Sequence, residues 1–349
     1  MLIADLEFAL IEAPARQGPA VRSLIVRLLT DTGIEGWGES TAIWRVGELV
    51  ARRDLVLPLL ADRNVFDVEE LLTLDVLASA PLRSAIEMAC WDAIGRQLKQ
   101  PLFRLWGGLY RPRIPVAARL PLDSPEGTAR FARELSVQGY RTLIITAAGQ
   151  CGHDAMVAQA VRDAIGGRAP LRIDGGRRFD RESAQELCRL LEPLGIQAAI
   201  DILAANDFVR HADLEQHTTL PLAVCQLVHG PRDLFALART SRSPQAIVNL
   251  DLVGGLTTAR KCAAAAEAAG VALSLGGASR LGIAAAAQLH LAAATPYLTV
   301  AHEFSCHLLL DDLISERFTA GDGFLGVPQG PGLGVEIDRD RFESLAARE

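Results

Sequence analysis

Two aspartates hold equivalent positions in the second half of the chain, where apolar and polar segments alternate. Asp174 ends an apolar run that begins at Leu171, and Asp201 ends the next run, which begins near residue 197. Apolar runs of this length predict buried strands. Carboxylates at neighbouring strand ends suit a hard divalent cation, Mg²⁺ before Zn²⁺, or a paired general acid and base. Two helix caps or two salt-bridge partners are the structural alternatives for the same pair.

Several other side chains with chemical potential also stand where a predicted strand ends. They are Thr146, Cys225, Gln226, Asp251, His302 and Glu303. Asp251 can act as a general base if burial raises its pKa, and His302 is of the residue type that titrates near neutral pH. Arg45 and Arg280 can hold a substrate carboxylate. A helix cap, a salt bridge or a buried structural role is the alternative for these residues.

The composition favours a soluble protein with a large core. Half of the 349 residues are hydrophobic, and the formal net charge is −7. A negative charge without a basic cluster argues against nucleic-acid binding. The six cysteines are far apart and form no CxxC pair, which predicts reduced and mostly buried thiols. No signal peptide is expected at the N-terminus, and the alanine-rich stretch 281–295 is too short to cross a membrane, so we expect a cytoplasmic protein.

The first part of the chain, residues 1–112, predicts an α+β domain. Its strands are expected at 2–12, 21–30 and 34–39, and its helices at 46–62, 66–78 and 81–97. The turn Asp31–Gly33 separates two of the strands, and Pro81 stands where a helix tolerates proline best. The Arg-Pro-Arg segment at 111–113 marks the predicted boundary.

From residue 113 to about 325, strand-length and helix-length runs alternate, which predicts a parallel (β/α)-barrel. Strands are expected near 115–120, 141–146, 170–174, 197–202, 221–226, 246–251, 271–275 and 297–301. Helices are expected near 125–137, 153–165, 181–193, 206–215, 230–240, 257–269 and 281–294. An open doubly wound sheet is the alternative, but no GxGxxG opens an early helix. The Gly- and Pro-rich segment 326–349 is expected to pack back on the first domain.

An ordered set of motifs along nearly the whole chain resembles the enolase superfamily. These motifs are IEGWGES at 34–40, the Trp-Asp helix with its Pro-Leu-x-x-Leu-x-Gly-Gly at 85–108, GYRTLIIT at 139–146, LRIDGG at 171–176, Gly-Gly-Leu-Thr at 254–257, 279–296 and PGLGVE at 331–336. The resemblance is strongest to the mandelate racemase and muconate lactonizing group, which includes cycloisomerases, dipeptide epimerases and N-succinylamino acid racemases. It implies a capping domain on a modified (β/α)₈ barrel.

The resemblance also implies a chemistry, namely removal of a proton next to a carboxylate with Mg²⁺ holding the enediolate. In this family, metal-binding carboxylates end the third, fourth and fifth barrel strands, so Asp174, Asp201 and Gln226 are the implied ligands. Lysine bases lie on the second and sixth strands. The family often carries an acidic residue after the last strand, where Glu303 stands.

The sequence departs from that pattern where the chemistry should lie. Ile144 and Thr146 occupy the positions of the strand-two lysines. Asp251, or Asn249 if the two-residue gap is placed otherwise, occupies that of the strand-six lysine. Cys225–Gln226 replaces an Asp-Glu pair, and Ala278 stands where glutamate is common. A threonine hydroxyl is a poor base without an activator. We therefore expect the barrel to fold normally and the lysine-based chemistry to be absent.

Three hypotheses follow for the function. The first is a divergent Mg²⁺-dependent isomerase, epimerase, cycloisomerase or lyase with Asp251, His302 or Thr146 in the catalytic roles. Its substrate would be a small carboxylate contacted by Arg45, Arg280, Glu303 and Cys225. The second is a non-catalytic member that binds a ligand or partner through the same site. The third is a barrel enzyme with metal-free chemistry. By resemblance, a homo-oligomer is expected.

Overall fold

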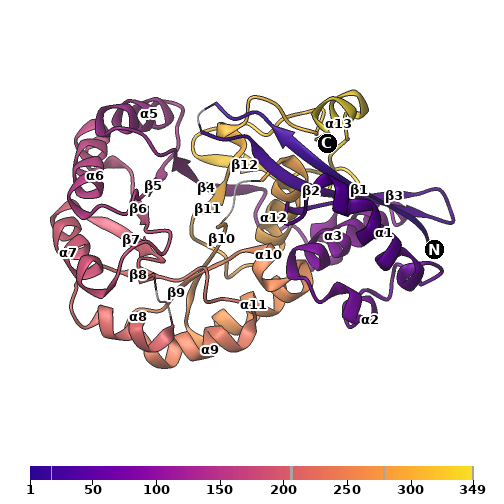
Figure 1. Ribbon diagram of the computed structural model, residues 1–349, viewed down its shortest axis with the longest axis horizontal. Coiled ribbons are helices and arrows are strands. Elements are labelled where there is room, and N and C mark those ends of the chain that lie inside the picture. The colour runs from indigo at the N-terminus through magenta and orange to yellow at the C-terminus, as the bar shows by residue number, and fades with distance from the viewer. Residues whose placement is uncertain (17, 205–206, 278–279, 348–349) are drawn as a thin grey trace.

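The computed structural model describes residues 1–16, 18–204, 207–277 and 280–347. Figure 1 shows two parts side by side, an N-terminal sheet with its helices and a ring of strands surrounded by helices. The C-terminal segment runs between these two parts (Figure 1). The predicted α/β class, with a capping domain beside a barrel of parallel strands, is confirmed.

Three antiparallel strands form the N-terminal sheet in the order β1-β2-β3. They are β1 (Ile3–Ala13), β2 (Val21–Thr30) and β3 (Glu35–Thr41), and the nearby helices are α1 (Val46–Leu60), α2 (Val68–Leu71), η1 (Asp75–Leu77), α3 (Ala80–Gln97) and α4 (Leu102–Leu105). Two glycines of β3 allow α3 to approach the sheet closely. A Cβ on Gly36 would lie 2.0 Å from the Ala89 carbonyl oxygen, and one on Gly38 would lie 1.8 Å from that of Ala85.

In the described part of the chain, eight parallel strands form the barrel. They are β4 (Arg113–Leu120), β5 (Thr142–Thr146), β6 (Leu171–Asp174), β7 (Ile196–Ile200), β8 (Leu222–Ala223), β9 (Gln245–Val248), β10 (Ala272–Leu275) and β11 (His302–Phe304). Consecutive strands from β4 to β8 pair in parallel, and a bridge between Val224 and Ala246 continues the ring to β9 and its partner β10. Strand β11 pairs in parallel with β4, so the last strand returns to the first.

Helices connect the strands on the outside of the barrel (Figure 1). They are α5 (Pro125–Val137), α6 (Cys151–Ile165), α7 (Arg181–Leu191), α8 (Phe208–Glu215), α9 (Pro231–Thr240), α10 (Leu250–Val253), α11 (Leu256–Ala269) and α12 (Gly282–Ala294), with short turns η2 (Gly166–Arg168), η3 (Glu192–Leu194) and η4 (Cys306–Leu308). The chain ends with β12 (Phe324–Gly326), which pairs antiparallel with β4, and α13 (Arg339–Leu345). Among the described residues, no helix is long and apolar enough to span a membrane.

Four predicted elements differ from the structure. The strand expected at 221–226 is shortened to the two residues of β8, Leu222–Ala223. The helix expected at 66–78 is broken into α2 and η1, where the Thr73 hydroxyl donates to the Glu70 carbonyl oxygen 2.7 Å away and competes with the helical pattern. The last barrel strand was expected at 297–301 but begins at His302. A turn occupies the expected stretch, and in it the Leu298 N–H donates to the Thr295 carbonyl oxygen. The sixth strand stops at Val248, and Asn249 caps α10 instead.

Buried carboxylates join the N-terminal sheet to the barrel. Glu39 of β3 accepts hydrogen bonds from the backbone N–H groups of Leu281 (2.7 Å) and Ala284 (2.8 Å) at the start of α12. The Ser23 hydroxyl donates to the same carboxylate at 2.8 Å. A carboxylate placed there satisfies N–H groups that the first turn of a helix leaves unpaired. These bonds fix the capping domain relative to the barrel.

Candidate binding site at the barrel mouth

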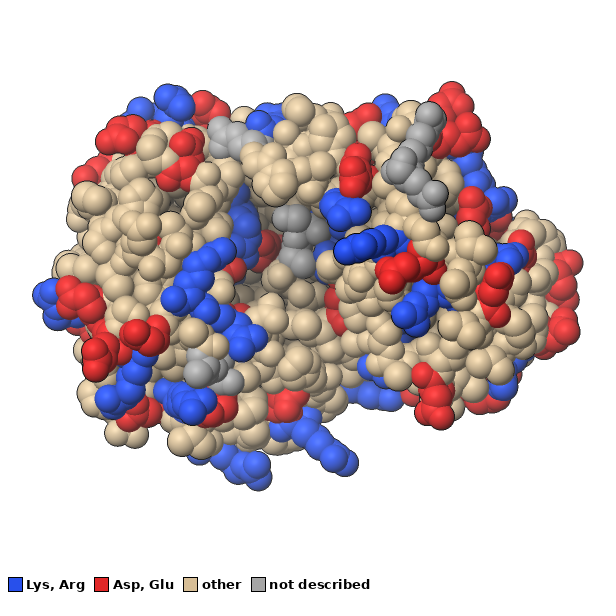
Figure 2. All heavy atoms as spheres, viewed as in Figure 1, with Lys and Arg blue, Asp and Glu red and all other residues tan. Residues whose placement is uncertain are grey.

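A cavity of about 130 Å³ opens where the barrel strands end. Charged side chains converge on it from four elements. The lining residues are Arg119, Asp174, Gly176, Arg177, Ile200, Asp201, Cys225, Gln226, Ile247, Gly277 and Glu303. On the face shown in Figure 2, the surface is hollowed over the barrel, and basic and acidic atoms both lie in the hollow. The structure therefore brings together five of the side chains that the sequence indicated, namely Asp174, Asp201, Cys225, Gln226 and Glu303.

The centre of this site is Arg119, which the sequence reading missed. Its Nη1 lies 2.8 Å from Asp174 Oδ2, and its Nε lies 2.5 Å from Glu303 Oε1. A second contact, from Nη2 to Glu303 Oε2 at 3.1 Å, makes the Glu303 pair bidentate. Nη1 also donates to the Thr146 hydroxyl at 3.4 Å. One guanidinium thus ties together side chains from β4, β5, β6 and β11.

The charges in this cluster stabilise one another. Burial alone would raise the pKa of Glu303, but Arg119 beside it outweighs burial, and the pKa is lowered. Burial alone would lower the pKa of Arg119, but Glu303 and Asp174 outweigh it, and the pKa is raised. Both groups therefore stay charged at neutral pH, and the guanidinium is the resident cation of the barrel mouth.

Asp201 is bound to the backbone of the neighbouring strand end. Its Oδ1 accepts the N–H of Cys225 and its Oδ2 accepts the N–H of Gln226, both at 3.0 Å. Its φ of 44° places its backbone in the left-handed region, a strained conformation for an aspartate that these bonds help to hold. Burial raises its pKa to about 6. Asp201 is therefore easier to protonate than an ordinary aspartate.

Cys225 faces the cavity as a neutral thiol. Burial, with nearby Asp201 and Glu303, raises its pKa well above the ordinary value, so a thiolate is disfavoured. The Cys225 Sγ would lie only 2.5 Å from a Cβ placed on Gly277, whose φ is +88°. Glycine at 277 therefore makes room for the sulfur and for the turn.

These donors do not fit the Mg²⁺ site that the resemblance implies. Asp174 is already paired with Arg119, and both oxygens of Asp201 accept backbone N–H groups. Of the pair that replaces the third carboxylate, Cys225 is a buried neutral thiol and Gln226 offers only an uncharged amide. A soft thiol is a poor ligand for a hard cation, and a guanidinium beside the ligands repels one. Within the described part of the chain, no group of three His, Cys, Asp or Glu side chains is arranged to hold a metal.

Asp251 and Arg280 lie outside this cavity and contact each other. The Arg280 guanidinium donates to Asp251 Oδ2, and both side chains are buried. The same Asp251 oxygen accepts the backbone N–H and the hydroxyl of Thr41 in β3, each at 2.6 Å. The residue that replaces the strand-six lysine thus joins the capping sheet to the barrel.

The remaining predicted site residues are also engaged elsewhere. His302 is fully buried, its Nδ1 accepts the Leu275 N–H at 3.0 Å, and burial lowers its pKa to about 3, so it stays neutral. The Thr146 hydroxyl donates to the Leu120 carbonyl oxygen at 3.0 Å. Arg45 is exposed at the start of α1. Ala278 lies outside the described residues.

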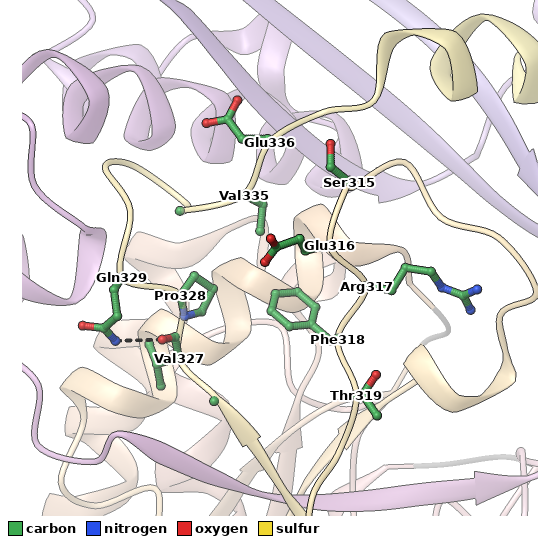
Figure 3. A pocket seen from close by; sticks show the side chains of 12 residues that line it. Ser315, Glu316, Arg317, Phe318, Thr319, Val327, Pro328, Gln329, Val335 and Glu336 are labelled. Atoms are coloured by element: carbon green, nitrogen blue, oxygen red, sulfur yellow. Dashed lines mark hydrogen bonds between the residues drawn. The ribbon is translucent and has the colours of Figure 1, made fainter.

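A larger hollow of about 570 Å³ lies away from the barrel mouth, between segments 315–319 and 326–336 (Figure 3). Figure 3 shows Phe318 and Glu316 pointing into it and Arg317 pointing away. Its charged side chains, Glu316, Arg317 and Glu336, are all exposed. Of these two hollows, only the one at the barrel mouth has buried charged side chains that contact one another. The barrel mouth is therefore the better candidate site.

Sequence comparisons agree with the fold. Residues 127–341 match the family described as "Enolase C-terminal domain-like", and residues 17–107 match "Mandelate racemase / muconate lactonizing enzyme, N-terminal domain". The N-succinyl-L-Arg/Lys racemase of Bacillus cereus is 26% identical over 334 residues, which cover 93% of this chain and 90% of the relative. The L-Lys-D/L-Arg epimerase of Methylococcus capsulatus is 32% identical over 270 residues, covering 74% and 73%.

Solved structures show the same architecture. The crystal structure of the N-succinyl Arg/Lys racemase from Bacillus cereus superposes with a TM-score of 0.90 at 24% identity, covering 100% of this chain and 99% of that one. Muconate lactonizing enzyme from Pseudomonas putida gives a TM-score of 0.89 at 22% identity, covering 99% and 100%. At this identity the likeness is evidence for the fold alone.

Proposed function

Because the chain belongs to the enolase superfamily, in the mandelate racemase and muconate lactonizing group, we propose that its barrel mouth binds a small carboxylate and does so without Mg²⁺. The observation that carries this proposal is the bidentate contact of Arg119 with Glu303 together with its ion pair to Asp174. The guanidinium places a positive charge beside Asp174, where the resemblance implies a divalent cation.

Two further arginines support an anionic ligand. Arg177 lines the cavity and is exposed, as is its neighbour Arg178. Arg177 Nη2 donates to the Ala204 carbonyl oxygen at 3.2 Å, and Arg178 Nη1 donates to that of Ala147 at 2.8 Å. A guanidinium has five N–H donors, so Arg177 keeps donors for a ligand carboxylate in the cavity, and Arg178, which is not among the lining residues, adds positive charge nearby.

The relatives named as racemases and epimerases support a second candidate, proton transfer next to the bound carboxylate. The specific observation in its favour is Asp201, which lines the cavity and has its pKa raised to about 6 by burial. Such a carboxylate is a suitable general base near neutral pH. In this case Asp201 would take the proton that the lysines take in the family, and Arg119 and Arg177 would hold negative charge on the substrate.

The binding claim is tested by calorimetric titration of small carboxylates, beginning with succinate and N-succinyl amino acids. We expect the carboxylate to bind with the same affinity in about 5 mM Mg²⁺ and in about 5 mM EDTA, each in large excess over the protein. Arg177→Gln should weaken binding about tenfold or more, the loss of one charge-assisted hydrogen bond. Arg189→Gln, on the exposed face of α7, is the matched control. Binding that needs Mg²⁺ would contradict the proposal.

Proton transfer is tested separately by following the ligand's α-proton in D₂O by NMR. Exchange that depends on protein and is lost in Asp201→Asn would establish catalysis. Ligand binding with no exchange over many hours would leave a binding protein on an isomerase scaffold, which is the non-catalytic alternative.

A further inference from the structure

Another arginine, Arg172, is buried inside the barrel, below the mouth. Arg172 of β6 is 6% exposed and precedes Asp174 by two residues, so both side chains point to the barrel interior. Its Nε donates to Gln197 Oε1 at 2.8 Å, and its Nη1 donates to the Ala301 carbonyl oxygen at 3.0 Å. Among the described residues, no salt bridge involves Arg172.

Arg172 borders a separate cavity of about 50 Å³. The polar groups around this cavity are Arg172, Gln197, Gln245 and Ser274, and the rest of its described lining is alanine and branched aliphatic, with no Asp or Glu. Because Gln197 Oε1 accepts from Arg172, its amide nitrogen is left as a donor. The described lining thus offers hydrogen-bond donors and one positive charge, and it contains no carboxylate.

The nearest carboxylate does not neutralise that charge. Glu303 affects the Arg172 charge electrostatically but forms no hydrogen bond with it, because both Glu303 carboxylate oxygens accept hydrogen bonds from Arg119. The neighbouring imidazole of His302 is neutral, since burial and Arg172 itself lower its pKa to about 3. A buried charge without a counter-ion is costly, and here burial lowers the pKa of Arg172.

We propose that this cavity binds a small monovalent inorganic anion, such as chloride, against the Arg172 guanidinium. The cavity of about 50 Å³ exceeds the ~10–15 Å³ that one water molecule needs on the same measure, so a single halide fits. The site is distinct from the barrel mouth and does not depend on the proposed function. Its occupant would act as a structural counter-ion that stabilises the lower barrel.

The first test compares melting temperatures in sodium chloride and in sodium gluconate of equal ionic strength. We expect the wild-type protein to melt about 2–4 °C higher in chloride, the shift given by an anion at several times its Kd. Arg172→Met should abolish this difference. Arg189→Met, which removes an exposed arginine, should keep it. A difference that survives in Arg172→Met is a general salt effect and would overturn the proposal.

The second test uses the unaltered protein and therefore does not depend on whether Arg172→Met folds. Crystals soaked in sodium bromide should show an anomalous peak in contact with Arg172 and Ser274, and Ser274→Ala should lower its occupancy. If the bromide peaks lie only elsewhere, or the cavity holds water alone, the proposal is overturned whatever the melts show.

Discussion

At the scale of single residues, Arg119 decides what the barrel mouth can do. It contacts Asp174, one of the implied metal ligands, and Glu303 at the end of the last barrel strand. An arginine is always charged and binds carboxylates through fixed, planar geometry, whereas a metal ion would leave open positions for substrate. On the proposal that this protein binds its ligand without Mg²⁺, the guanidinium makes the barrel mouth an ion-pair network and not an electrophilic centre.

Removing that guanidinium should be costly. Arg119→Gln leaves Glu303 buried with a net charge and no cation beside it, and breaking a buried pair costs about 3–5 kcal/mol. Urea unfolding would measure the loss. Arg119→Lys keeps the charge without the bidentate geometry and should lose less. Equal stability of Arg119→Gln and wild type would show that the cluster does not stabilise the fold.

At the scale of elements, the close approach of α3 to β3 depends on two glycines. A Cβ at Gly38 would meet the Ala85 carbonyl oxygen at 1.8 Å, so Gly38→Ala must push the helix from the sheet. We expect a loss of at least about 3 kcal/mol in unfolding free energy, the upper end for overpacking. The matched control is Gly152→Ala in α6, where a Cβ meets nothing within 4 Å.

The control should move in the opposite direction. An alanine within a helix is favoured over glycine by about 0.5–1 kcal/mol, so Gly152→Ala should stabilise slightly. Thermal melts of both variants check the pair. Equal stability of Gly38→Ala and Gly152→Ala would contradict the close contact between α3 and β3 at Gly38.

At the scale of the whole molecule, the joint between capping domain and barrel should depend on pH through Glu39. Burial raises the pKa of Glu39 to about 7, above its ordinary value of 4.5. A raised folded-state pKa means that the folded protein binds the proton more tightly than the unfolded chain. Glu39 therefore contributes stability below pH 4.5 that is lost as the pH rises toward 7, up to about 3 kcal/mol.

Glu39→Gln removes the titrating group and keeps hydrogen-bonding atoms near the start of α12. The unfolding free energy of wild type minus that of Glu39→Gln should fall as the pH rises from 4.5 to 7. Chemical denaturation across that range measures it. A constant difference would show that Glu39 titrates at the same pH in both states.

The architecture of the whole molecule was predictable from the sequence because it rests on repeated patterns. Alternating apolar runs placed the barrel strands to within a few residues, and strand ends indicated Asp174 and Asp201. What the sequence could not reveal was pairing across the ring. Arg119 lies one residue before the end of β4. The only sequence feature that could have indicated its role is its charge within an apolar strand, two positions after Ala117, which faces the barrel interior. Nothing local indicated that His302 would be buried and neutral.

The most direct test of the account is a calorimetric titration of Mg²⁺ into wild type and Arg119→Gln at neutral pH. The wild type should give no binding heat at millimolar Mg²⁺. Arg119→Gln, which leaves Asp174 and Glu303 without their cation, should gain measurable affinity. Specific binding of Mg²⁺ by the wild type, abolished by Asp174→Ala, would contradict the claim that Arg119 is the cation of this site.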